Sequence, residues 1–189
     1  MKEDFPKPNF VPGEAFEGKI KEGVDFVFEQ NPELAKIGTK EKYSEYLDTI
    51  FPESKIKNIV YHTTSSPDIE EFRKREFGIY FAFSPTKSIA GNIVYSVIVN
   101  AENPLIKPNR DASREEKIEY NEKVENFYTP ISIINGYIRI YEYDSSIEHS
   151  TTTKESIQLK IRNPEQIHIL GSKKDIERFK EFVQDNKVK

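Results

Sequence analysis

The 189-residue chain contains no cysteine and no tryptophan, and only one methionine. The missing cysteines exclude disulfides and thiolate chemistry. No run of about 18 apolar residues is present, so the sequence predicts no membrane-spanning helix. The opening stretch, MKEDFPKPNF, lacks the apolar segment of a secretory signal. We therefore expect a soluble protein that is cytoplasmic, or that is delivered into a target cell by an unrecognised route.

Neither sign of charge dominates, because 32 acidic and 28 basic residues leave a formal net charge of −4. A mixed surface of this kind gives no bulk electrostatic reason to bind nucleic acid, although it leaves room for a local basic groove. A chain of this length is typical of one domain, which buries roughly 70% of its unfolded surface and folds without a metal or a disulfide.

The first third of the chain has helical patterning. Residues 1–13 contain three prolines and a glycine, which predict a flexible lead. Apolar residues from Glu14 to Gln30 recur at helical spacing, and a short helical turn is predicted to end at Gly38. Thr39 is a candidate N-cap for the next helix. We expect residues 14–51 to form an N-terminal helical segment.

After residue 51 the pattern changes to short strands. The runs KNIVYHTTS, FGIYFAF, NIVYSVIV, ESIQLKI and QIHIL predict strands, and ISIINGYIRIYEY predicts a hairpin around its Asn-Gly turn. Two capping boxes, Ser113 to Glu116 and Ser172 to Asp175, predict an inserted helix and a final helix. Helices followed mainly by strands indicate an α+β fold with an antiparallel sheet at its core.

Alternation along these strands assigns side chains to faces. Ile79 and Phe81 share one face, so Tyr80 points the other way. Glu155 opens ESIQLKI on the parity of its apolar residues, and His62 closes an earlier strand. Each of these residues alone is typical of an ordinary structural position. Their order along the chain, His then Tyr then Glu on separate strands, suggests a site.

That order resembles the ADP-ribosyltransferase superfamily, in the histidine–tyrosine–glutamate class that includes the poly(ADP-ribose) polymerases and diphtheria-like toxins. VYHTTS resembles the strand of that class that ends in His-Gly-Ser or His-Gly-Thr. GIYFAFSPTKSIAGN resembles its Gly-Ile-Tyr-Phe-Ala run and following Lys-Ser, and ESIQLKIRNPEQIHIL resembles the strand that opens with the catalytic glutamate. The likeness covers about residues 58–172 and extends to compact bacterial and phage domains of polyvalent proteins.

The resemblance implies a split β-sandwich of two mainly antiparallel sheets with flanking helices, with residues 52–189 as the catalytic domain. The implied activity is mono-ADP-ribosyl transfer from NAD+, used as a co-substrate without a metal, to an unknown protein or nucleic-acid acceptor. A toxin, an effector or a phage-type modifier would act in this way. The resemblance implies no membrane partner, and it leaves the oligomeric state open.

The roles implied for the site residues follow from the same resemblance. His62 would hydrogen-bond the ribose, and the backbone at Thr63 would hold the nicotinamide amide. Tyr80 would stack on the nicotinamide ring, and Ser88 would hydrogen-bond its carboxamide. Glu155 would hold the 2′-hydroxyl and stabilise the oxocarbenium, because a carboxylate beside a developing cation stabilises the transition state more than the ground state.

The chain departs from the pattern of that class at three positions. Thr63 replaces the glycine that follows the histidine, and its Cβ would narrow the nicotinamide slot or change a backbone angle. Gly91 stands near the place of the second aromatic that closes the nicotinamide sandwich, and Tyr95 is out of register with that place. Thr153 replaces the glutamate found two residues before Glu155 in arginine-modifying transferases, which disfavours arginine as the acceptor.

Three other functions stay open. The first is a catalytically inactive NAD-binding or interaction module of the same fold. The second is an NAD-dependent RNA phosphotransferase, which needs basic residues around the site to bind phosphate; the run Arg73-Lys74-Arg75 offers one such cluster but is typical of a solvated loop. The third is a small nuclease that uses His62 with His149 or His168, although both partners have the setting of structural residues.

Overall fold

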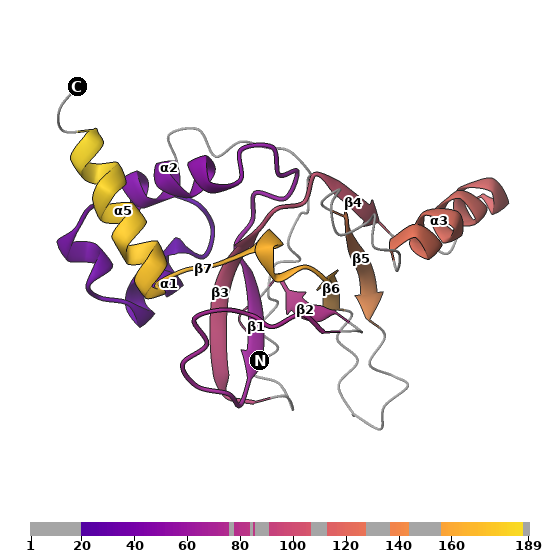
Figure 1. The fold of residues 1–189 in the computed structure, drawn as a ribbon, viewed down its shortest axis with the longest axis horizontal. Helices are drawn as coiled ribbons and strands as arrows, with labels where there is room; N and C mark the ends of the chain where they lie inside the picture. Colours follow the sequence, from indigo (N-terminus) through magenta and orange to yellow (C-terminus); the bar gives the residue numbers. More distant parts are fainter. Residues whose placement is uncertain are drawn as a thin grey trace, which may run out of the picture.

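The computed structural model describes residues 20–75, 78–83, 85, 91–106, 113–127, 137–143 and 156–186. Helices from the two ends of the described chain lie together on one side of a curled sheet (Figure 1). The helical elements are α1 (Val24–Gln30), η1 (Leu34–Lys36), α2 (Lys40–Ile50), α3 (Arg114–Phe127), η3 (Pro164–Gln166) and α5 (Lys173–Asp185). The strands are β1 (Val60–Thr64), β2 (Ile79–Ala82), β3 (Ile93–Val99), β4 (Asn103–Ile106), β5 (Tyr137–Tyr143), β6 (Ser156–Ile161) and β7 (Ile167–Ile169). The α+β class predicted from the sequence is confirmed.

The strands form one seven-stranded sheet in the order β4-β5-β6-β2-β1-β3-β7. Every neighbouring pair is antiparallel except β4 and β5, which run parallel. The three strands that carry the His, Tyr and Glu motifs are therefore neighbours at the centre of the sheet, although β6 comes much later in the sequence than the consecutive strands β1 and β2.

The sequence resemblance implied a sandwich of two sheets, and the structure differs from that expectation. All seven strands belong to one hydrogen-bonded sheet. The joint between β1 and β2 is narrow, since Tyr61 and Ala82 form its one paired position. Five residue pairs join β1 to β3 and four join β2 to β6. Among the described residues, the sheet thus consists of two well-paired parts that are joined by one β1–β2 backbone pair.

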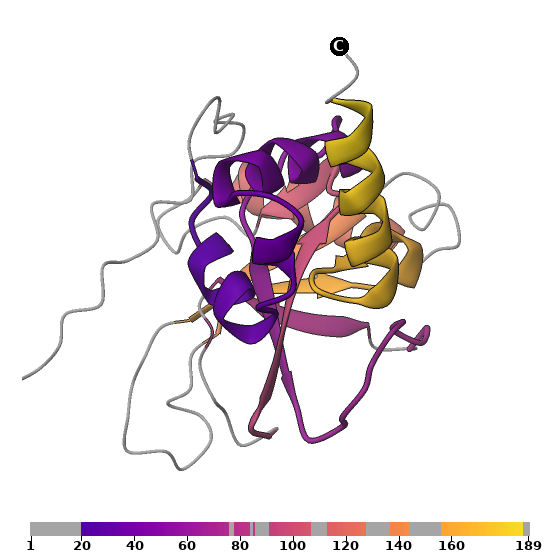
Figure 2. The same cartoon turned by 90° about the vertical axis from the view of Figure 1, so that its left-hand side faces the viewer.

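Two apolar clusters cover opposite faces of β1 and β3. The helical core lies between these strands and α1, α2 and α5, and includes Val27, Tyr43, Tyr61, Ile98 and Phe179. Figure 2 shows these helices in front of the strands. The sheet core lies inside the curl and joins Val60, Val97, Phe81, Leu159 and Phe72. The described part of the N-terminal helical segment therefore packs on the sheet together with the final helix.

The predicted caps agree with the structure. The Thr39 side chain accepts a hydrogen bond from the Lys42 amide at the start of α2. Ser113 and Glu116 form both bonds of a capping box before α3. The Ser172 hydroxyl accepts from the Asp175 amide at the start of α5. Local side chain to backbone bonds of this kind depend on sequence spacing alone, which is why the sequence reveals them.

Two predicted elements differ from the structure or lie outside its description. The first helix was expected from Glu14, but it begins at Val24, and residues 20–23 are not helical. Gly23 has a φ of 92°, a left-handed conformation that interrupts a right-handed helix. The first strand of the predicted hairpin lies outside the described residues, while its second strand forms β5. None of the described helices is long and apolar enough to cross a membrane.

Candidate functional site at the junction of β1 and β2

His62 directly follows Tyr61, which forms the one described backbone pair between β1 and β2. Its Nδ1 is 2.8 Å from the Tyr80 carbonyl oxygen. This side-chain bond joins His62 of β1 to Tyr80 of β2, in addition to the backbone pair of Tyr61 with Ala82. The imidazole also packs edge-on against Phe72, with ring centroids 5.0 Å apart, and lies 5.5 Å from the ring of Phe81. His62 is therefore fixed on the sheet-core side of β1.

The partners of His62 determine its protonation state. A carbonyl oxygen can only accept a hydrogen bond, so Nδ1 carries the proton in the bond to Tyr80. Burial lowers the pKa of His62, and the positive charge of Arg75 lowers it further, although the bond to the Tyr80 carbonyl opposes both effects. The neutral form is favoured, and its Nε2 lone pair is an acceptor for a hydroxyl group.

Ile79 and Phe81 lie on one face of β2, and Tyr80 lies on the other, as the alternation of the sequence predicted. Its side chain is on the outer face, and the residue is 42% exposed, whereas Ile79 and Phe81 are buried. Lys160 of β6 lies directly opposite Tyr80 in the ladder, and its Nζ stands 5.4 Å from the centre of the tyrosine ring. Tyr80 is thus an exposed aromatic surface beside a fixed cation.

His62 and Tyr80 are neighbours, but their rings do not face each other. The His62 ring lies on the side of Phe81, and Tyr80 alternates with Phe81 along β2. The contact between the two residues runs through the Tyr80 carbonyl. A ligand that contacts both residues would therefore reach around the backbone pair that joins β1 to β2.

The threonine that follows His62 needs no unusual backbone. Thr63 is paired with Val94 within the β1–β3 ladder, and among the described residues Asp68 is the one non-glycine residue with a positive φ. Replacement of glycine by Thr63 therefore introduces no left-handed strain. Its remaining effect is the added side chain, which lies on the parity of Tyr61, away from His62.

Gly91 holds the start of β3 against the end of β1. It has a φ of 150°, and a Cβ at this position would lie 2.1 Å from the Thr64 carbonyl carbon. Only a glycine fits so close to another backbone. Gly91 therefore lies directly beside the end of the strand that carries His62.

Two predicted site residues, Ser88 and Glu155, lie outside the described residues. Glu155 immediately precedes Ser156, where β6 begins, and β6 pairs with β2 through Gln158 and Ala82 among others. Of the predicted set, the structure brings together His62, Thr63 and Tyr80. The expectation that all the site residues line one cleft stays a prediction.

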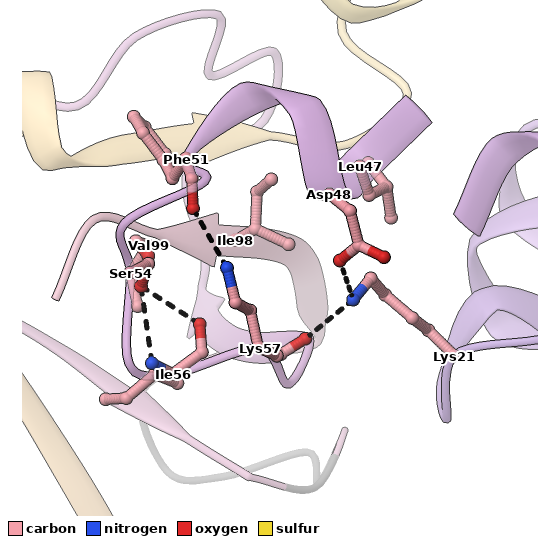
Figure 3. A pocket seen from close by; sticks show the side chains of 9 residues that line it. All are labelled: Lys21, Leu47, Asp48, Phe51, Ser54, Ile56, Lys57, Ile98 and Val99. Atoms are coloured by element: carbon pink, nitrogen blue, oxygen red, sulfur yellow. Dashed lines mark hydrogen bonds and ion pairs between the residues drawn. The ribbon is translucent and has the colours of Figure 1, made fainter. Parts of the chain in front are cut away.

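The pocket shown in Figure 3 lies elsewhere in the molecule, between the end of α2 and β3. Lys21 and Asp48 form an ion pair of 2.5 Å in its wall, and Lys21 also donates to the Lys57 carbonyl. Burial lowers the pKa of Lys21, and the bond to Asp48 opposes this shift. These contacts tie the segment before α1 to α2. None of His62, Thr63 and Tyr80 lines this pocket, so we regard it as structural.

The other candidate histidines and basic residues have structural settings where they are described. His168 is buried, and its Nε2 lies 2.7 Å from Asp175, away from His62. His149 lies outside the described residues. Arg73, Lys74 and Arg75 are exposed, as expected of a solvated loop.

Two contributors to the site were missed by the reasoning from sequence. Phe72 follows two glutamates in a charged loop, and its burial against His62 depends on a contact that no local pattern predicts. Lys160 lies on the outward parity of ESIQLKI, which is a usable signal, but its position opposite Tyr80 requires knowledge of the β2–β6 register.

Comparisons of the chain with models of protein families, with curated proteins and with solved structures found no match. Among the described residues, no group of three or more histidine or carboxylate side chains is arranged to hold a metal ion. The expectation of metal-free chemistry stays a prediction.

Proposed function

We propose that the protein is an NAD+-dependent mono-ADP-ribosyltransferase whose site lies at the β1–β2 junction. One observation carries the proposal: the strands with the His, Tyr and Glu motifs are adjacent in the order β6-β2-β1, and His62 is bonded to the backbone of Tyr80. A late strand that pairs beside two consecutive early strands is the arrangement that a composite site of these three motifs requires. The narrow β1–β2 joint supports the split sandwich that the resemblance implies.

The chemistry fits the residue types. The bond between C1′ of the ribose and N1 of nicotinamide breaks, and its electron pair stays on N1, so the nicotinamide leaves neutral. An oxocarbenium develops at C1′, which the Glu155 carboxylate would stabilise. The acceptor donates a lone pair to C1′ and loses a proton. Neutral His62 would accept a hydrogen bond from a ribose hydroxyl at Nε2, and Tyr80 would supply a stacking surface for the nicotinamide.

The inactive binding module is the second candidate function, and Thr63 was its main support. Thr63 adopts ordinary strand geometry, which weakens the argument that this residue abolishes activity. A binding module also has no need for the carboxylate of Glu155. We therefore favour the enzyme.

Tyr80 gives a direct test of the proposed ligand. We expect the Tyr80→Ala variant to bind NAD+ roughly tenfold more weakly, because stacking of a base on an aromatic side chain contributes about 1–3 kcal/mol. The matched variant Tyr80→Phe keeps the ring and should bind NAD+ as the wild type does. Titration calorimetry on the full chain measures both. Equal affinity of all three proteins would show that NAD+ does not use Tyr80.

A further inference from the structure

Lys160 is an unusual neighbour for a proposed nicotinamide platform. The residue is 7% exposed, whereas Tyr80, directly opposite it in the β2–β6 ladder, is 42% exposed. Its stem also packs on Gly78, since a Cβ added to Gly78 would lie 3.0 Å from Lys160 Cγ and 3.2 Å from Cε. The side chain is therefore held along the sheet, with its ammonium over the Tyr80 ring at 5.4 Å.

A cation fixed over one face of an aromatic ring affects what can stack on the other face. The ring quadrupole attracts positive charge, and here Lys160 supplies that charge. A second cation on the far face is repelled by the first, because the two like charges are separated by little more than the ring and its contacts. A neutral ring on that face meets no such repulsion.

We propose that Lys160 makes the Tyr80 platform select a neutral pyridine ring over a cationic pyridinium. This inference rests on the proposed function, because the charge that distinguishes the two rings is the one that changes in the reaction. Bound NAD+ carries a positive pyridinium. When the C1′–N1 bond breaks, its electron pair remains on N1, and the departing nicotinamide is neutral.

Lys160 then influences where positive charge is located during the reaction. Its ammonium disfavours positive charge on the nicotinamide ring, while the Glu155 carboxylate would favour positive charge on the ribose. Both effects favour the same displacement of charge, from ring to sugar, during cleavage. An interaction that is better in the transition state than in the ground state raises the rate of the chemical step.

The test compares two ligands of nearly equal shape and different charge: nicotinamide, and nicotinamide methylated on the ring nitrogen, which is a cation. Their Kd values are measured on the full chain for wild type and three variants. Lys160→Met keeps the stem over Gly78 and removes the charge, Lys160→Arg keeps the charge, and Lys180→Met removes one exposed lysine on α5 as a matched control.

We expect the wild type to prefer the neutral ligand, and Lys160→Met to reduce that preference roughly fivefold, as for like charges several ångströms apart at a surface. Lys160→Arg should restore the preference, Lys180→Met should leave it unchanged, and added salt should shrink it. An unchanged preference in Lys160→Met, with both ligands bound, overturns the inference and leaves the proposed function standing. Failure of the wild type to bind either ligand overturns both.

Discussion

At the scale of single residues, His62 is a hydrogen-bonding side chain that the end of strand β1 holds in place. The imidazole belongs to the residue after the one described backbone pair between β1 and β2, and its bond to the Tyr80 carbonyl fixes the Nδ1 tautomer. The sequence predicted that His62 and Tyr80 belong together. The sequence did not predict that His62 bonds to the backbone carbonyl of Tyr80. Every residue has such a carbonyl, so the type of residue does not indicate which one accepts the bond.

His62 predicts a specific dependence of stability on pH. Its pKa is lowered in the folded protein, mainly by burial, so below about pH 6.5 the unfolded chain takes up a proton that the folded chain does not. The free energy of unfolding therefore falls as the pH decreases from about 6.5 toward the folded-state pKa of His62. We expect His62→Gln to reduce this acid-side loss by up to about 1.4 kcal/mol per unit of pKa shift.

Urea unfolding of both proteins between pH 5 and 8 measures this effect. The two proteins are first compared at pH 8, where His62 is neutral in both states and the difference reflects only the change of shape and bonding. Curves that stay parallel from pH 8 to pH 5 would contradict the assigned burial of the neutral imidazole.

At the scale of elements, features that depend on nearby residues could be predicted from the sequence, and features that depend on distant contacts could not. The caps at Thr39, Ser113 and Ser172 were predicted from spacing, and so was the alternation that turns Tyr80 outward. The order of the strands was not predicted, because the register of β2 with β6 depends on contacts across the fold. The late start of α1 was also missed, since Gly23 looks acceptable within a helical pattern until its positive φ is known.

Asp175 illustrates the same limit within one helix. Sequence spacing assigned it to a capping box, and its backbone amide does donate to Ser172. Its fully buried carboxylate instead bonds the Tyr43 hydroxyl at 2.5 Å, the Tyr46 hydroxyl at 3.1 Å, the Gly171 amide and His168. Burial and the charge of Asp175 raise the pKa of Tyr43, so that its hydroxyl remains a donor. The carboxylate therefore joins α2, β7 and α5.

We expect Asp175→Asn to destabilise the protein by about 2–4 kcal/mol, because the amide keeps only one of the two acceptor oxygens and places an NH2 donor against buried donors. Ser172→Ala is the matched control at the same helix start, and loss of its cap should cost about 1 kcal/mol. Chemical denaturation of both variants measures the difference. Equal destabilisation by the two changes would mean that Asp175 contributes only as a helix cap.

At the scale of the whole molecule, the fold places the strands of three weak motifs side by side. The helical core fixes β1 and β3 from one side, and the sheet core fixes β2 and β6 from the other. His62 and Tyr80 lie at the narrow joint between these two parts of the sheet. The sequence predicted the class of fold and the residues of interest. The curl of the sheet and the single-pair joint depend on packing among distant segments, which no single stretch of sequence specifies.

Release of nicotinamide from NAD+ by the full chain is the decisive measurement for the proposed ADP-ribosyltransferase. We expect the wild type to release nicotinamide in equal amount to the ADP-ribose transferred to an acceptor or to water. Glu155→Gln should retain NAD+ binding and lose about a hundredfold or more in rate, as when one preorganised electrostatic group is removed from an active site. NAD+ binding by the wild type, with nicotinamide release no faster than in Glu155→Gln, would rule out the proposed enzyme and support the inactive module.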